Sequence, residues 1–404
     1  MENFLSQWGE AAYTSLGFFW MAFWAFNLGY LISSLIQVFI TPAGMQKAMG
    51  QNEGKGVLLG SFFGFISSSC SFAALAGTKA LLKKGASFPA AMAYLLASTN
   101  LVIELGIVIS IFLGSAFLWG EYIGGLLLIL TAWLLIRIIQ PRSLLQKVRD
   151  RLGQEDQDEE KQPNLRQRFK QKENWLKVSR QFKMEWQMVW KDVTIGFTIA
   201  GLVAIFVPDA FFTTLFINLD TEGGPGFFSI LQHVIIGPIA AFMTFIGSMG
   251  NIPLAALLFD RGVSFAGVMA FIFSDLVVFP VLRINARYYG WRMSFFILLL
   301  LFLSLIITTL CLHYGFEALN FLPEASKGTS ITERDHFQVD YTLFLNLGFF
   351  LLGVILFYGA FGPARNLKHH HQMANKGRLT ETVLFYLALL SYVWLGLGLL
   401  WKFF

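Results

Sequence analysis

Two acidic residues, Glu104 and Asp275, lie within stretches of the sequence that are otherwise almost wholly apolar. A carboxylate at the centre of a bilayer costs about 2.5–3.5 kcal/mol on a scale taken from membrane insertion. Such groups usually face a cavity or a partner, and apolar surroundings bring a carboxyl group closer to exchanging protons at neutral pH. Both acids are therefore candidates for proton coupling. The alternative is a neutral acid that serves only as a structural hydrogen bonder.

Clusters of hydroxyl, thiol and amide side chains interrupt or follow other apolar stretches. A helix that restarts after an interruption directs its positive N-terminal end there, which suits an anionic or strongly polar substrate. For a single Ser or Thr, a hydrogen bond between helices is the alternative. The candidate substrate-binding residues are Ser68, Ser69, Cys70, Ser71, Ser98, Thr99, Asn100, Ser248, Asn251 and Ser274.

Cys70 supplies one thiol to the first of these clusters. A thiolate binds soft metals and metalloids, and a small packed side chain is an equal alternative. No other metal ligand is predicted, and no cofactor is expected. Lys79 either pairs with one of the two acids or extends to the membrane interface. No G-x-x-x-x-G-K-[ST] motif is present, so an ATP-driven pump within this chain is not expected.

The composition sets the class of protein that must position these residues. The chain has 404 residues, of which 55% are hydrophobic and only 14% are charged, against about 25% in soluble domains. So little charge is not enough for the polar surfaces of two or three soluble domains, which excludes a soluble enzyme and a disordered protein. The net charge of +5 comes from short basic clusters between apolar runs, so nucleic acid is not an expected partner. The composition therefore indicates an integral membrane protein.

Long apolar runs locate the membrane-spanning helices, each of which needs about 20 residues. Eight runs qualify: 16–40, 88–113, 117–139, 192–216, 265–282, 295–311, 341–361 and 382–401. Two more runs, 56–82 and 227–259, are broken by small polar, Gly and Pro residues at 67–71 and 247–253. Non-helical backbone at membrane depth is tolerated only where protein or a water-filled cavity satisfies it.

A charged segment, residues 140–191, divides the chain into two hydrophobic halves. We expect it to be a solvated cytoplasmic linker that is partly helical, and docking of a cytoplasmic partner is the alternative. The predicted organisation is a first transmembrane repeat (1–139), the linker, a second transmembrane repeat (192–316), and an extracytoplasmic loop followed by a C-terminal helix pair (317–404).

The two halves resemble each other in sequence. Residues 85–94 align with residues 262–271 at an offset of 177, with five of ten positions identical. The same offset brings the two broken runs to equivalent places. Interrupted segments at corresponding positions of two halves are the best sequence indication of a transporter's binding site. Chance similarity between two apolar stretches is the alternative.

The basic residues distinguish two topologies, because cytoplasmic loops are rich in Lys and Arg. If both broken runs span the membrane, nine basic residues fall outside. If both are re-entrant hairpins, only Arg261, Lys327, Arg334 and Lys402 do. Each repeat then makes an odd number of crossings, so the second is inverted. The predicted fold is an all-α polytopic membrane protein with two inverted repeats, each containing a broken re-entrant hairpin, plus the C-terminal helix pair.

These motifs resemble those of the ArsP/YraQ-type predicted permease family of bacterial membrane proteins. The resemblance lies in residues 70–74, 83–86, 97–106, 250–255, 270–276 and 288–290. It implies a permease of the cytoplasmic membrane, and characterised relatives are similar to efflux proteins for trivalent organoarsenicals. Arsenical-exporting relatives carry a Cys-x-Cys pair where this chain has Cys70 and Phe72, and close relatives often have Cys where it has Gly247. One thiol is a poor As(III) site.

The sequence thus predicts a secondary-type permease, not an enzyme, in the cytoplasmic (inner) membrane. It is expected to move a small polar or anionic solute or a metalloid compound, with Asp275 and Glu104 carrying protons. The alternatives are a membrane subunit or scaffold that binds a cytoplasmic partner at 140–191, and a membrane-embedded enzyme. Expected partners are a small-molecule substrate and the lipid bilayer, and a homodimer is left open. The substrate, direction of transport and coupling ion are not specified.

Overall fold

The computed structural model describes residues 2–39, 53–67, 71–83, 85–139, 142–152, 171–208, 211, 214–216, 226–244, 248–323, 337, 339–359 and 378–403. Every regular element within these ranges is a helix, which confirms the all-α prediction. Six of the helices are long and apolar enough to cross a membrane, and eight crossings result if each of two bent helix pairs counts as one.

The first half contains α1 (Glu2–Phe39), α3 (Glu53–Ser67), α4 (Ser71–Lys83), α5 (Phe88–Asn100), α6 (Ile103–Phe112) and α7 (Ser115–Ile139). It is followed by α8 (Arg142–Leu152). The second half contains α10 (Lys172–Phe206), α12 (Phe227–Thr244), α13 (Ser248–Asp260), α14 (Phe265–Ile272), the 3₁₀ turn η1 (Phe273–Leu276), α15 (Phe279–Tyr289) and α16 (Trp291–Ala318). The chain then forms α17 (Tyr341–Gly359) and α18 (Arg378–Phe403).

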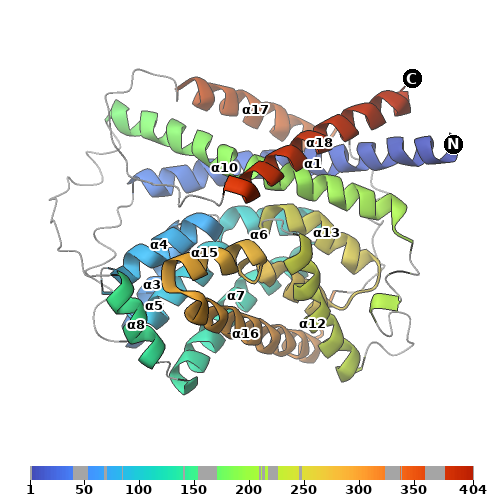
Figure 1. Cartoon of the computed structure of the whole chain (residues 1–404). Helices are drawn as coiled ribbons and strands as arrows, with labels where there is room; N and C mark the ends of the chain where they lie inside the picture. The colour runs from blue at the N-terminus through green and yellow to red at the C-terminus, as the bar shows by residue number, and fades with distance from the viewer. Residues whose placement is uncertain are drawn as a thin grey trace.

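The helices form two layers (Figure 1). α1 and α10 pack against each other, and α17 and α18 pack on both, so these four helices make one layer. The other helices make a compact body beneath it, which α1 contacts through α6 and α10 contacts through α13. Both chain termini lie at one end of the four-helix layer, where Lys402 Nζ is 2.7 Å from Glu10 Oε2.

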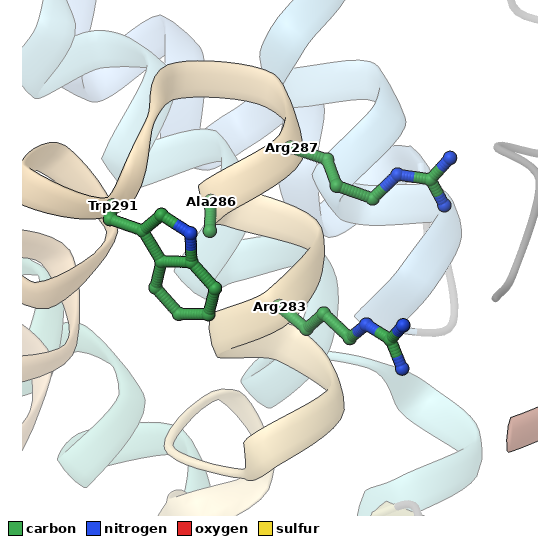
Figure 2. Close-up of a pocket in the computed structure, with 4 residues that line it drawn as sticks. All are labelled: Arg283, Ala286, Arg287 and Trp291. Atoms are coloured by element: carbon green, nitrogen blue, oxygen red, sulfur yellow. The ribbon is translucent and has the colours of Figure 1, made fainter.

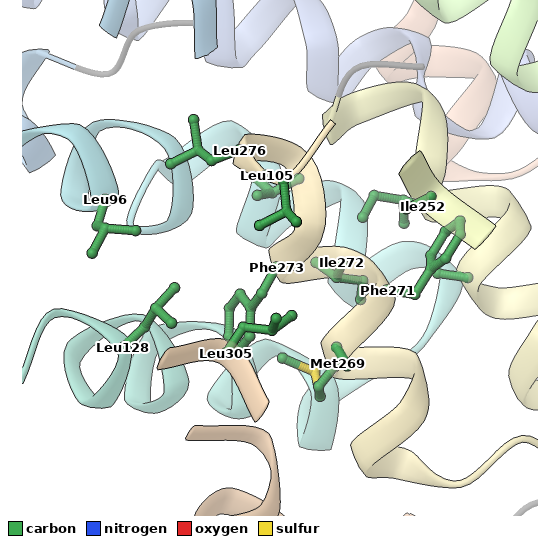
Figure 3. Packing of buried hydrophobic residues seen from close by; sticks show 14 of the residues in the cluster. Leu96, Leu105, Leu128, Ile252, Met269, Phe271, Ile272, Phe273, Leu276 and Leu305 are labelled. Atoms are coloured by element: carbon green, nitrogen blue, oxygen red, sulfur yellow. The ribbon is translucent and has the colours of Figure 1, made fainter. Parts of the chain in front are cut away.

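One continuous apolar core joins the two halves. Leu96, Leu105 and Leu128 of the first half belong to the same buried cluster as Phe273 and Leu305 of the second (Figure 3). In a membrane protein the outer surface is also apolar, so this core is distinguished by tight packing rather than by composition. The cluster surrounds the places where α5–α6 and α14–α15 bend.

The helix boundaries of the two halves match at the offset found in the sequence. α3 and α12 end at residues 177 apart, as do the first residues of α4 and α13 and of α5 and α14. Gly85 and Gly262, which link these helices, have φ of 87° and 89°, a left-handed conformation that favours Gly. Ser87 and Ser264 then cap α5 and α14, each accepting a hydrogen bond from the amide three residues on.

Close helix packing repeats in the same way. A Cβ on Gly60 of α3 would collide with the carbonyl oxygen of Ala90 on α5. A Cβ on Gly237 of α12 would lie 2.7 Å from the carbonyl oxygen of Gly267 on α14. The two glycines are 177 residues apart, and so are the two residues that they approach, so the sequence repeat has a counterpart in local geometry. The inverted orientation of the second repeat stays a prediction.

Two of the predicted spans are bent. Residues 88–113 form α5 and α6, which meet at 42°, and the run that begins at residue 265 forms α14, η1 and α15, with a bend of 40°. Apolar composition does not distinguish a straight span from a bent one, so the sequence predicted the two runs but not their bends. The bends occur where polar side chains, Asn100 and Asp275, lie in or beside the break.

Two predicted boundaries also move. The second break was expected at 247–253, but α13 already begins at Ser248 and contains Pro253. α10 begins at Lys172, twenty residues before the apolar run predicted at 192. The residues between are charged, yet they alternate with Val178 and Phe182, which are fully buried. The first part of α10 is amphipathic and its later part is apolar, which explains why the helix begins before the apolar run.

Candidate functional site

The bend between α14 and α15 brings two predicted site residues together. Asp275 lies in the 3₁₀ turn η1 and is 3% exposed. Ser71, the first residue of α4, donates a hydrogen bond from Oγ to Asp275 Oδ2 over 3.1 Å. The two residues are 204 positions apart and belong to different halves of the chain. The start of α4 therefore lies against the bend of the second half.

The polar cluster at the end of α5 is arranged differently. Ser98, Thr99 and Asn100 are all buried. Their side chains donate hydrogen bonds to carbonyl oxygens of Leu95 and Leu96, one turn back in the same helix. The last carbonyls of a helix lack intrahelical partners, and these side chains supply donors close to that end. These three side chains thus satisfy backbone groups at the bend, and their described hydrogen bonds stay within α5.

Glu104 follows this bend, in the first turn of α6. Its side chain is buried, and α1 passes so close that a Cβ on Gly29 would collide with the Glu104 side chain. A carboxylate in the first helical turn is stabilised by the partial positive charge of the helix N-terminus. Glu104 is therefore buried beside the N-terminal end of α6 and against α1.

The first turn of α13 contributes a buried amide. Asn251, in the first turn of α13, has no exposed surface. Its helix lies directly on α10, where a Cβ on Gly196 would come within 2.6 Å of the Gly250 carbonyl oxygen. Ser248 begins α13, and Ser274 donates a hydrogen bond to the carbonyl oxygen of Phe271. Ser68, Ser69 and Cys70 lie outside the described residues, so their predicted roles stay predictions.

A third carboxylate, Glu121 of α7, was missed by the sequence analysis. Its side chain is fully buried, and neither carboxylate oxygen has a hydrogen-bond partner among the described residues. Glu121 interacts electrostatically with Asp275, and Tyr122 with both Glu121 and Glu104. The sequence signal was the same as for Glu104: one acid inside an apolar run. A buried carboxylate needs a proton, a cation or a dipole to offset its loss of hydration.

Two helix N-termini begin beside these acids. α4 begins beside Asp275, and α6 begins one residue before Glu104. In addition, α4 packs on α15 and α13 packs on α6, so each of these helices contacts the helix after the bend of the other half. Helix N-termini carry partial positive charge and unpaired amides, which bind anionic or polar groups.

One predicted alternative, the position of Lys79, is decided by the geometry. Lys79 Nζ lies 4.4 Å from the centroid of the Tyr288 ring, and Lys79 forms no ion pair within the described ranges, so it pairs with neither acid. Among the residues that the structure describes, no group of three or more His, Cys, Asp or Glu side chains has the arrangement of a metal site.

The sequence of this chain matches a protein family and a known protein. The family model with the description "Predicted permease", ArsP_1, matches residues 7–314. A protein of Mycobacterium tuberculosis (strain ATCC 25618 / H37Rv) named "Putative permease Rv2963" is 31% identical over 319 residues, which cover 76% of this chain and 77% of that protein. No solved structure matches the chain.

Proposed function

This chain belongs to the ArsP_1 family of predicted permeases and is a multi-pass protein of the inner membrane, and from that premise we propose that it is a secondary permease for a small polar or anionic solute. The observation that carries the proposal is the hydrogen bond from Ser71 to Asp275. It joins a hairpin of one half to a bend of the other, deep in the apolar core, where polar groups mark transport pathways.

The substrate class follows from charge. The helix N-termini at α4, α6 and α13 direct positive partial charge toward the core, and Asn251 and Ser71 add neutral polar groups. These features favour an anion or a strongly polar solute. Metalloid compounds remain in the substrate panel because Cys70, the one thiol of the first hairpin, lies outside the described residues.

Proton coupling is proposed for the three buried acids. Asp275 and Glu104 lie at the two bends, and Glu121 interacts electrostatically with Asp275. Loss or gain of a proton by one acid changes the stability of charge on its neighbour. Since each bend also contacts the hairpin of the other half, protonation would alter how the halves meet.

Flux measurements test this function. The purified chain in proteoliposomes with an imposed pH gradient should accumulate or expel at least one member of a panel of oxyanions, thiols and arsenicals. A protonophore should abolish that gradient-driven flux. Flux that is insensitive to the pH gradient would contradict proton coupling, and no saturable flux of any panel member would contradict the substrate class.

Two sets of contacts support an inverted arrangement of the repeats. α8 packs on α4 and α15, at the open end of the first hairpin. The second hairpin opens elsewhere: Phe227 stacks on Tyr314 near the end of α16, and Arg261 donates a hydrogen bond to the carbonyl oxygen of Ala204 near the end of α10. α16 begins beside α15, so its far end lies away from α8.

Accessibility labelling tests the inversion. Gly85 and Gly262 are unsuitable sites because their positive φ would strain a Cys. In a background that lacks Cys70 and Cys311, Ala86→Cys should label from the cytoplasm and Asp260→Cys from outside. Labelling of both from one side would contradict the inverted repeats without affecting the flux test. A homodimer and a cytoplasmic partner at 140–191 stay open.

A further inference from the structure

A basic pocket lies at the junction of α15 and α16, at the end of the molecule where α8 packs. It has a volume of about 370 Å³ and is lined by Arg283, Ala286, Arg287 and Trp291 (Figure 2). Arg283 and Arg287 are one helical turn apart, so they share a face of α15. Figure 2 shows both guanidinium groups extending in the same direction. The pocket therefore presents two guanidinium groups and an exposed indole ring.

The described helices around this pocket carry mostly positive charge. The sequences of α15, of α4 and of the first turn of α16 contain no Asp or Glu. α8 packs on both α4 and α15 and carries a single acid, Asp150, against four basic residues. Lys79 adds a further cation over the ring of Tyr288. A ligand of this pocket is consequently expected to be an anion.

An apolar stripe leads away from the pocket along α16. It comprises Trp291, Phe295, Leu299, Leu303 and Ile307, spaced four residues apart. All five side chains are exposed, from 37% for Leu303 to 57% for Leu299. Successive side chains at this spacing are neighbours, so the five form a continuous exposed face that winds gradually around α16. In a membrane-spanning helix such a face contacts lipid chains, and Trp is enriched at the level of the headgroups.

We propose that this pocket binds the headgroup of an anionic phospholipid, with its acyl chains along the α16 stripe. The two arginines pair with the phosphate and the rest of the anionic headgroup, since guanidinium groups match phosphate oxygens. The stripe distinguishes a lipid from a free anion, because a soluble phosphate gains nothing from Phe295 or Leu299. Basic pockets on the cytoplasmic side of a membrane protein bind anionic lipids in this way.

Native mass spectrometry of the full chain in detergent tests the proposal. Titration with phosphatidylglycerol should show one tightly bound lipid, whereas phosphatidylcholine should bind more weakly and without saturation. Loss of both charges in R283Q/R287Q should weaken that lipid roughly 25-fold, at roughly fivefold per basic residue. R283K/R287K should retain most of the affinity, which keeps the test valid if the glutamine variant is unstable. R137Q, which removes an exposed arginine of α7 outside the pocket, is the matched control.

Several outcomes would overturn the proposal. Equal phosphatidylglycerol binding in wild type and R283Q/R287Q would show that the two arginines do not bind the lipid. Complete displacement of the lipid by inorganic phosphate would indicate a soluble-anion site. A dimer that persists in every variant, with no lipid difference, would indicate that a second copy covers the stripe. None of these measurements involves transport, so the proposed permease function is tested separately.

Discussion

The two bends of the molecule have similar backbones but different chemistry. At the end of α5, Thr99 and Asn100 hydrogen-bond to their own helix, so the bend is satisfied from within the first half. At η1, Asp275 instead accepts a hydrogen bond from Ser71 of the other half. The first bend is therefore neutral and self-contained, and its acid, Glu104, follows in the next helix.

This difference suggests how a repeated scaffold becomes asymmetric. Matching glycines and serine caps hold the two halves in one geometry, while ionisable groups differ between equivalent places. A transporter with inverted repeats needs the first feature to alternate between two states. The second feature lets a proton affect one half more than the other. The variants below compare the loss of an ionisable group with the loss of a close helix contact that both halves share.

The largest effect is expected at Asp275. Asp275→Asn keeps the shape and the bond to Ser71 but removes ionisation. We expect proton-driven flux in proteoliposomes to fall by at least about 100-fold, the scale on which loss of a proton-transferring group acts. Solute binding should survive, because the other polar contacts remain.

Asp260→Asn, an exposed acid at the end of α13, is the control and should transport normally. Normal flux with normal pH dependence in a well-inserted Asp275→Asn protein would make Asp275 a structural hydrogen bonder. The two bends would then be chemically equivalent, and Glu104 would be the leading candidate for coupling.

The scaffold is tested by the paired glycines. Gly60→Ala should lower the free energy of unfolding by about 1–3 kcal/mol, the usual cost of overpacking, because its Cβ would collide with the Ala90 carbonyl. Gly237→Ala should cost less, since its Cβ would lie 2.7 Å from the Gly267 carbonyl oxygen. Melting temperatures in detergent measure both.

Gly54→Ala provides the matched control on α3, because no atom lies within 4 Å of its added Cβ. It should be neutral or should stabilise the helix by up to about 1 kcal/mol. Equal melting temperatures for Gly54→Ala and Gly60→Ala would show that the close approach of α3 to α5 is not required.

Much of this fold was readable from apolar runs. Each of the eight predicted runs corresponds to one long helix or one bent pair, because bilayer thickness fixes helix length. The bends could not be predicted from hydropathy, since residues 88–113 and the run from 265 stay apolar across them. The backbone there is broken by local hydrogen bonding, as at Asn100 and η1, and hydropathy does not report that.

The sequence predicted residues of the candidate site only where an acid interrupts an apolar run. Asp275 and Glu104 were found this way, and Glu121 carries the same signal but was passed over. The pairing of Ser71 with Asp275 was not predictable, because it depends on how two distant elements pack. The hydroxyl of Ser98 bonds the Leu95 carbonyl, a local contact that the sequence did not predict, and its predicted contact with substrate stays a prediction.

Glu121 sharpens the comparison of the halves. Glu121→Gln keeps the volume and removes the charge beside Asp275. We expect proton-driven flux to fall roughly tenfold, in keeping with the effect of a neighbouring charge on a buried acid. Melting temperature should stay the same or rise, since an unpartnered acid is replaced by a neutral amide. Unchanged flux over the whole pH range would reduce Glu121 to a buried neutral acid.

The smallest effect is expected at the contact that joins the halves. Ser71→Ala removes one hydrogen bond to the Asp275 carboxylate, worth about 1.5 kcal/mol because the acceptor is a charged group. We expect flux to fall by roughly tenfold or less, with the pH dependence displaced because Asp275 loses a donor. Ser61→Ala is the matched control: its hydroxyl bonds only the Val57 carbonyl of its own helix, so flux should not change. If both variants behave alike, the cross-half bond is incidental, and the first hairpin acts on the second half through packing rather than through Asp275.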